Sequence, residues 1–267
     1  MKHILVAADF SDRSRLALQR AALLAKAHGA RLTLCHSDNG TLSGAYAEKH
    51  RRMMEELQSD FLREVEPLLD VEYESHIVSG PPWQALLRES EALNADLLVL
   101  GRHQENAWKE VFRGTTVDRV VRQTHIPVLI VASNEVTDYR HVLVGMDFSA
   151  AAKQALRTAK NWVPDADMEV IHVSEKPDSG VHRGRTDEEL KEMLRSVVGE
   201  EIANAKARLT VETGWPYRVF SQTVKNDGTK LLVLGIHAST GFTSVVVGGE
   251  VENCLATPFC DTLLVPS

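Results

Sequence analysis

The segment ILVAADFS at residues 4–11 decides the fold, because VLVGMDFS at residues 142–149 repeats it 138 positions later. In each copy a run of apolar residues ends at Asp-Phe-Ser, which is typical of a strand buried on both faces of a parallel sheet. The segment LLVLG also occurs twice, at residues 97–101 and 231–235, with a spacing of 134. Landmarks in the same order at nearly the same spacing indicate two copies of one domain.

The closing segments of the two copies support this division. The apolar runs VLIV at residues 128–131 and TLLV at residues 262–265 share the spacing of 134. We therefore predict one domain at residues 1–135 and a second at residues 140–267.

Composition excludes several classes of protein. The 267 residues are 43% hydrophobic and 25% charged, which is typical of globular proteins. The formal net charge of −7 disfavours broad binding to nucleic acid or anionic membranes. The three cysteines lack CxxC spacing, which disfavours a disulfide framework or a zinc site. Because no apolar run reaches the ~18–20 residues that span a bilayer and no signal pattern opens the chain, we expect a cytoplasmic protein without membrane or nucleic-acid partners.

The first copy alternates strand and helix patterns. Ser11 or Asp12 can cap a helix that ends at Gly29. Alternating strands and crossover helices predict an α/β fold with a doubly wound, five-stranded parallel sheet. Further helices are predicted within residues 45–69, 83–93 and 115–124, and further strands at residues 31–35, 71–78, 97–100 and 128–131.

The second copy repeats this pattern with one expected difference. Its strands are predicted near residues 142–144, 168–173, 217–223, 231–234 and 262–265. From Tyr73 to Leu97 the chain advances 24 positions, but from the apparent counterpart Tyr217 to Leu231 it advances only 14. A parallel crossover needs about a dozen residues including its helix. We therefore expect a shortened third crossover, which would disable the second copy's binding crevice and leave that copy a structural role.

Candidate functional residues follow the first and fourth strands of each copy. In a doubly wound sheet, ligands bind outside the carboxyl ends of the strands, where the strand order reverses. Asp9 and Asp147 follow the first strands, and Gly101 and Gly235 end the fourth. The glycines allow close backbone approach or a positive φ. Each aspartate can support a metal ion on phosphates, contact a ribose, or merely cap the next helix.

The segment Gly114-Thr115-Thr116 opens a helix in the first copy. Its bare amides can hold an anion at the positive end of the helix dipole. In the alternative interpretation, Thr115 forms a capping box with Asp118. The two roles are compatible, because a hydroxyl can accept from an amide and donate its own proton.

Together these motifs resemble the universal stress protein family, in tandem over nearly all of both halves. The resemblance implies the strand order 3-2-1-4-5 in each domain and pairing of domains through strand five, here as an intrachain pseudo-dimer that could also form a homodimer. In one branch of the family, ATP is bound by Gly, two residues, Gly, nine residues, Gly, then Ser or Thr. The other branch lacks this motif and binds no nucleotide.

The chain falls between these branches. The first copy keeps Gly101, Gly114 and Thr115 at the family spacing, but Gln104 replaces the second glycine. Around this loop Arg102, Lys109 and Arg113 add positive charge.

The second copy matches the motif less well. It keeps Gly235 and Gly248, but Ala238 replaces the second glycine and Gly249 replaces the hydroxyl residue. The resemblance also implies that the residue after the strand-two histidine, here Ser37 or Val173, offers its backbone to adenine. The sequence thus leaves two alternatives for the first copy. It binds Mg²⁺-ATP weakly, or the Gln104 side chain occupies the space of the phosphates and prevents binding.

Two functions follow from these observations. The first is a stress-response regulatory protein that binds ATP through a degenerate glycine motif and acts on a protein partner of unknown identity. The alternative is a nucleotide-independent scaffold that acts through protein contacts. We do not expect an enzyme or a resident metal site, because the sequence has no recognisable nucleophile–base pair or metal-ligand spacing, although weak ATPase activity stays open.

Overall fold

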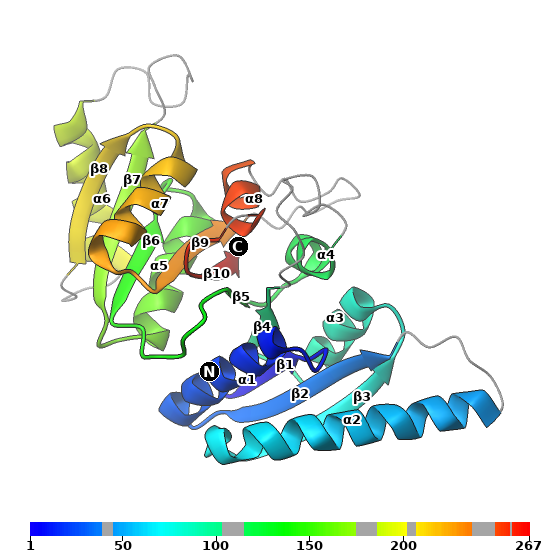
Figure 1. Ribbon diagram of the computed structural model, residues 1–267. Coiled ribbons are helices and arrows are strands. Elements are labelled where there is room, and N and C mark those ends of the chain that lie inside the picture. The colour runs from blue at the N-terminus through cyan, green and yellow to red at the C-terminus, as the bar shows by residue number, and fades with distance from the viewer. Residues whose placement is uncertain (39–44, 103–114, 175–185, 202–206, 237–248, 257) are drawn as a thin grey trace. The chain divides into compact units, whose positions relative to one another are not determined.

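The computed structural model describes residues 1–38, 45–102, 115–174, 186–201, 207–236, 249–256 and 258–267. The described residues up to 137 form one compact unit, called unit one here, and the described residues from 138 onward form unit two. In each unit, strands and helices alternate along the chain (Figure 1). The predicted α/β class is therefore confirmed.

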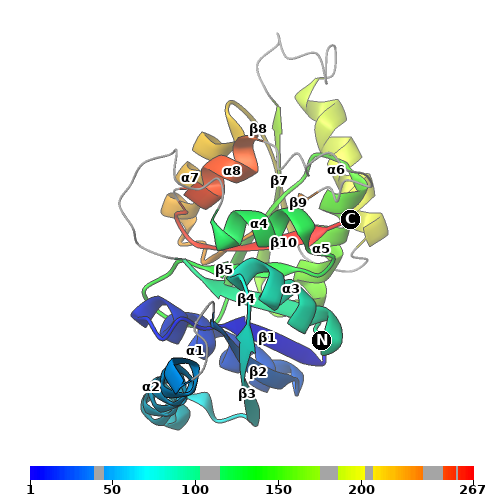
Figure 2. The same cartoon turned by 90° about the vertical axis from the view of Figure 1, so that its right-hand side faces the viewer.

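Unit one is a parallel sheet with the strand order β3-β2-β1-β4-β5. The chain moves outward from β1 to β3 and then returns to β4 and β5, so right-handed crossovers place α1 and α2 on one face and α3 and α4 on the other (Figure 2). The elements are β1 (His3–Ala7), α1 (Asp12–His28), β2 (Arg31–Asp38), α2 (Ala45–Leu69), β3 (Tyr73–Ser79), α3 (Pro82–Ala92), β4 (Leu97–Gly101), α4 (Thr116–Gln123) and β5 (Val128–Val131).

Local signals account for the helix ends in unit one. The Ser11 hydroxyl caps α1 by accepting from the Ser14 amide at 3.2 Å, and Gly29 ends the helix at φ 60°. The Thr115 hydroxyl caps α4 by accepting from the Asp118 amide at 3.2 Å. The predicted caps at these positions are confirmed.

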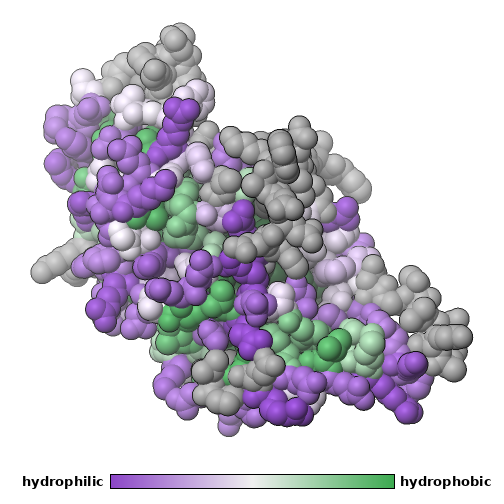
Figure 3. Space-filling model, in the orientation of Figure 1, coloured by the Kyte–Doolittle hydropathy of each residue, from purple (hydrophilic) through white to green (hydrophobic). Residues whose placement is uncertain are grey.

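The central strands form the core because helices cover both faces of the sheet. Ile4, Leu5 and Val6 of β1 are fully buried, as are Leu97 and its neighbours in β4. Such double burial explains why these strands read as continuous apolar runs. By contrast, the outer face of α2 is mostly hydrophilic (Figure 3).

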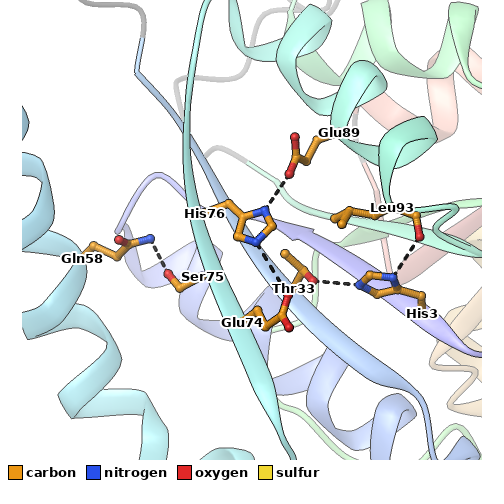
Figure 4. A network of polar contacts seen from close by, with 8 residues as sticks. All are labelled: His3, Thr33, Gln58, Glu74, Ser75, His76, Glu89 and Leu93. Carbon is orange, nitrogen blue, oxygen red and sulfur yellow. Dashed lines mark hydrogen bonds and ion pairs between the residues drawn. The ribbon is translucent and has the colours of Figure 1, made fainter.

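A polar network ties the strands of unit one to α3 (Figure 4). The buried His3 ring contacts Thr33 Oγ1 at 2.8 Å through Nε2 and the Leu93 carbonyl at 3.1 Å through Nδ1. On β3, His76 Nδ1 contacts Glu89 Oε1 of α3 at 2.6 Å. These contacts give hydrogen-bond partners to polar groups that α3 buries against the sheet.

Unit two repeats this architecture, with the strand order β8-β7-β6-β9-β10. Helices α5 and α6 pack together, and so do α7 and α8. The elements are β6 (His141–Gly145), α5 (Ala150–Trp162), β7 (Asp167–Ser174), α6 (Asp187–Glu201), β8 (Ala207–Thr213), α7 (Pro216–Asp227), β9 (Leu231–Ile236), α8 (Gly249–Ala256) and β10 (Asp261–Pro266).

The expected shortened crossover in unit two is wrong. Residues 217–223 belong to α7 and not to a strand, and the third strand of the unit is β8. Tyr73, the first residue of β3, corresponds to Ala207 rather than Tyr217, because the spacing of 134 holds from the third strand onward. The third crossover therefore contains a complete 12-residue helix. Unit two therefore has its third crossover helix, and the structural role inferred from the absence of this helix has no basis.

Two expectations remain, and the structure bears on one of them. No helix in the described ranges combines the length and apolar character needed to cross a membrane. Pairing of the two units through their fifth strands stays a prediction.

Candidate functional site

The Asp-Phe-Ser turn is built alike in both units, at the carboxyl edge of the sheet. In unit one, Asp9 Oδ1 accepts from the Ser11 amide at 3.0 Å and from the Ser11 hydroxyl at 2.5 Å. In unit two, Asp147 Oδ1 accepts from the Ser149 amide at 2.9 Å. The phenylalanine between the aspartate and the serine has a positive φ in each turn, 63° at Phe10 and 65° at Phe148. Each aspartate thus holds the serine that caps the following helix, and a metal or ribose role for it stays a prediction.

A histidine on the second strand of each unit fixes this turn. His36 Nδ1 contacts the Ala8 carbonyl at 2.8 Å, and His172 Nδ1 contacts the Met146 carbonyl at 2.7 Å. Because a carbonyl only accepts, Nδ1 carries a proton in both rings. The Phe10 ring stacks on His36 with centroids 4.3 Å apart. Sequence reasoning noted these histidines only as markers of a strand end, although their recurrence in both copies was a usable signal.

Strand β2 continues past the end of β1 and exposes backbone groups to the crevice. Cys35, which lies beside Ala7, accepts from the Ala8 amide at 2.9 Å, so its backbone polar groups face β1. Alternate residues of a strand face the same neighbour, so Ser37 directs its amide and carbonyl to the same side, where β1 has already ended. The Ser37 hydroxyl donates to the Gly80 carbonyl at 2.7 Å. A contact between Ser37 and a base stays a prediction.

Gly101 and Gly235 allow the first helix of each unit to pack directly on the fourth strand. A Cβ atom at Gly101 would lie 2.6 Å from the Arg13 carbonyl oxygen, in the first turn of α1. A Cβ atom at Gly235 would lie 2.3 Å from the Ala151 carbonyl carbon, in the first turn of α5. Of the two interpretations of these glycines, the structure supports close backbone approach, since neither has a positive φ.

The remaining motif residues are only partly described. Thr115 caps α4, and Thr116 is its first residue. Gly249 is the first residue of α8. Gln104, Gly114 and Gly248 lie outside the described residues.

Two arginines gather at the carboxyl edge of unit one. Arg13 Nη1 donates to Asn134 Oδ1 at 2.9 Å and to the Ala132 carbonyl at 3.3 Å. Arg102 follows β4, and its amide donates to the Val131 carbonyl at 3.0 Å. Burial, and then the positive charge of Arg13, lower the pKa of Arg102 below its usual value. Two like charges therefore lie close together at the end of β4 and β5.

Sequence reasoning missed Arg13. Within the described ranges no carboxylate lies at ion-pair distance from its guanidinium group. A cation in the first turn of a helix is unfavourable, because it faces the positive end of the helix dipole. This unfavourable placement is the signal that could have identified Arg13, and an anion at the edge would relieve it.

The family model described as the universal stress protein family matches residues 1–132 and 138–266. The chain belongs to the universal stress protein family. Two matches in one chain also confirm the tandem arrangement of domains. In the part of the chain that the structure describes, no group of three His, Cys, Asp or Glu side chains could hold a metal ion.

One curated relative and two solved structures illustrate what the chain is similar to. The universal stress protein A homolog of Haemophilus influenzae is 31% identical over 137 residues, which are 49% of this chain and 95% of that protein. A solved structure of a universal stress protein from Archaeoglobus fulgidus is 20% identical to this chain, with a TM-score of 0.79. The similarity covers 99% of this chain and 98% of the Archaeoglobus chain. A universal stress protein solved in complex with cAMP is 24% identical, with a TM-score of 0.41. The similarity covers 49% of this chain and 96% of that protein's chain.

Proposed function

We propose that this universal stress protein is a regulatory protein that binds Mg²⁺-ATP at the carboxyl edge of unit one. The observation that carries the proposal is the gathering of anion-binding groups at this edge. Arg13 and Arg102 supply two positive charges, and Thr115 supplies a hydroxyl at the start of α4. Parallel α/β sheets bind ligands at such an edge, where the strand order reverses between β1 and β4.

The phosphates would lie between these groups. Helix N-termini bind phosphate because their first amides lack intrahelical acceptors and the helix dipole is positive there. Thr115 can cap α4 and also donate to a phosphate oxygen. Arginine adds charge-assisted hydrogen bonds, which are stronger than neutral ones. The first glycine of the family motif, Gly101, has a different task, because it brings α1 against β4.

The base and the metal ion have candidate partners at the same edge. The Ser37 amide and carbonyl face the space beyond β1 and offer one donor and one acceptor to a base. A Mg²⁺ ion needs only one or two carboxylates besides phosphate oxygens and water, so Asp9 suffices as its protein ligand. When bound, the ion neutralises part of the phosphate charge.

Calorimetry with millimolar ATP and Mg²⁺ tests the proposal. Thr115→Ala removes one hydrogen bond to a charged group, worth about 1.5–3 kcal/mol, and should weaken binding roughly tenfold to hundredfold. Arg13→Ala should cause a loss of at least about tenfold for the same reason. The matched control is Arg31→Ala, which removes an exposed arginine from the opposite edge of the sheet, at the start of β2. This variant should bind ATP like the wild type.

Two outcomes would contradict the proposal. If the wild type released no heat, the nucleotide-independent scaffold would be the better description of the protein. If Arg13→Ala and Arg31→Ala lost affinity equally, the effect would come from net charge and not from a site at the carboxyl edge.

A further inference from the structure

Helix α2 carries two large apolar side chains that stay about half exposed. Met53 is 47% exposed and Leu57 is 44% exposed. The inner face of the helix is marked by Phe61, which is 4% exposed and whose ring centroid lies 5.6 Å from that of Phe10. The helix lies at the outside of unit one in both views of the molecule (Figure 1, Figure 2). The Met53 and Leu57 side chains are therefore placed to contact another molecule.

A charged residue stands at each end of this apolar pair. Lys49 lies four residues before Met53, and Asp60 lies three residues after Leu57. Steps of three and four residues place side chains on one side of a helix. Lys49 is exposed, and the Asp60 side chain is 65% exposed. These four residues, called the α2 stripe here, run from a cation through two apolar groups to an anion.

The anionic end of the α2 stripe can still bind a partner. Asp60 Oδ1 accepts from Arg63 Nη1 at 2.9 Å, but the two residues are three positions apart and both side chains are exposed. Exposed pairs of this kind contribute little to stability. A carboxylate also accepts from more than one donor. The contact with Arg63 therefore leaves Asp60 able to pair with a cation of another molecule.

The two halves of α2 also differ in charge. Residues 48–52 contain three lysine and arginine residues and one glutamate, whereas residues 55–60 contain three carboxylates and no lysine or arginine. The single glutamate, Glu48, accepts from Arg51 at 2.7 Å and from Arg52 at 3.2 Å, so the first segment keeps a net positive charge. A second α2 running parallel would set like charges side by side. An antiparallel one would set the basic segment of each copy against the acidic segment of the other.

The α2 stripe is complementary to itself in this antiparallel direction. Lys49 and Asp60 have their midpoint between residues 54 and 55, and Met53 and Leu57 have theirs at residue 55. A twofold axis at this point places each residue opposite the other member of its pair in the second copy, as a closed dimer requires. With a rise of 1.5 Å per residue, both charges lie about 8 Å from the axis and both apolar side chains lie within about 4 Å of it. An apolar centre with a charged rim is typical of a specific interface.

We infer that a second copy of this chain docks on the α2 stripe as an antiparallel helix pair, with Met53 against the partner's Leu57 and Lys49 against the partner's Asp60. This surface is separate from the fifth strands and from the ATP site proposed for unit one, and it depends on neither. Because each copy contributes only two large apolar side chains, the dimer forms with rising concentration and is not obligate.

Sedimentation velocity of the full-length protein over a range of concentrations tests the surface. Leu57→Ala should weaken association about tenfold or more, because one apolar contact is lost on each side of the axis. Alanine is a good helix former, so this exposed change keeps α2 intact. The matched control is Trp215→Ala, which removes the third large hydrophobic side chain exposed in the described residues, 59% exposed in the turn between β8 and α7 of unit two. This variant should associate like the wild type.

A charge exchange tests the antiparallel register. Lys49→Glu alone and Asp60→Lys alone should each weaken self-association about tenfold or more, because two ion pairs become two like-charge contacts. Mixing the two purified variants should restore association. In the mixed dimer the new carboxylate at position 49 of one copy faces the new ammonium group at position 60 of the other, and the two natural residues also face each other.

Several results would overturn the inference. A wild type that stays monomeric up to its solubility limit would exclude the dimer. Equal association of Leu57→Ala and the wild type, or a loss in Trp215→Ala alone, would place the interface elsewhere. If the two charge variants did not associate better when mixed, the register would be wrong. If the monomeric wild type floated with vesicles of phosphatidylcholine and phosphatidylserine and Leu57→Ala did not, the α2 stripe would bind membranes and not a second copy.

Discussion

Replacing Gly101 by alanine tests how the carboxyl edge of unit one is built. The new methyl group would lie 2.6 Å from the Arg13 carbonyl oxygen and 2.8 Å from the Arg13 carbonyl carbon, and ordinary contact begins at 3.4 Å, so the two distances are about 0.8 and 0.6 Å too short. Both atoms belong to the backbone of α1, so no side-chain rotation can relieve the clash and the helix must move. Overpacking of this kind costs about 1–3 kcal/mol. The ratio of folded to unfolded protein should therefore fall about five- to 150-fold.

Urea denaturation combined with hydrogen exchange locates this effect. Gly101→Ala should speed exchange in β1 and α1, and Gly235→Ala, with its Cβ 2.3 Å from Ala151, should speed exchange in β6 and α5. The control is Gly199→Ala within α6, where a Cβ atom meets nothing within 4 Å. This change should raise stability by about 0.5–1 kcal/mol, because alanine is the better helix former. If Gly101→Ala were as stable as the wild type, the close approach of α1 to β4 would not be the reason for the glycine.

Two further predictions concern the caps and the thiols. Ser11→Ala removes the acceptor that caps α1, so the free energy of unfolding measured by urea denaturation should fall by about 1 kcal/mol. Ser11→Asp keeps an acceptor and should restore most of this loss, and equal stability of the two variants would contradict the capping role. Burial raises the pKa of Cys35 from 9.0 to about 12, so above about pH 9 the unfolded thiol ionises while the folded one stays neutral. The free energy of unfolding should therefore fall with rising pH above 9, by up to about 1.4 kcal/mol per pH unit for this thiol, and Cys35→Ala should flatten the decline; an identical decline in both proteins would refute the assignment.

The sequence predicted the central strands and the helix caps because their signals are local. A strand buried on both faces must be apolar along its whole length, and β1 and β4 are. Likewise, the caps at Ser11 and Thr115 and the stop at Gly29 depend on a few neighbouring residues. Neither signal requires knowledge of distant contacts.

The third strand of unit two was missed because its signal is weak. Strand β8 lies at the edge of the sheet, and each of its residues is half-buried or exposed, so it has no apolar run. Helix α7 instead contains Tyr217, Val219 and Phe220, which favour strands by intrinsic preference. Phe220 and Val224 are nevertheless buried four residues apart, which is helical spacing, and Pro216 stands in the first turn where proline suits a helix.

The candidate site was predictable only in part. Repetition identified both Asp9 and Gly101. The role of Asp9 is local, since its carboxylate accepts from Ser11 two residues along the chain. The reason for Gly101 lies in the backbone of α1, which is distant in sequence and carries no local signal. Arg13 was invisible to motif reasoning, since it contacts Asn134, which is 121 positions away. Contacts of this range depend on how α1 lies against β4 and β5.

The carboxyl edges of the two units differ by substitution and not by displacement. From the third strand onward the corresponding elements of the two units keep one spacing of 134, so β3 corresponds to β8 and β4 to β9 residue by residue. The spacing falls earlier, from 138 at the first strands to 136 at the second and 134 at the third, so each of the first two crossovers is two residues shorter in unit two. Arg102 and Ile236 therefore occupy the same place on the sheet, as do Pro81 and Trp215. The two edges therefore differ in charge and aromatic character while the strands and helices that carry these positions stay the same.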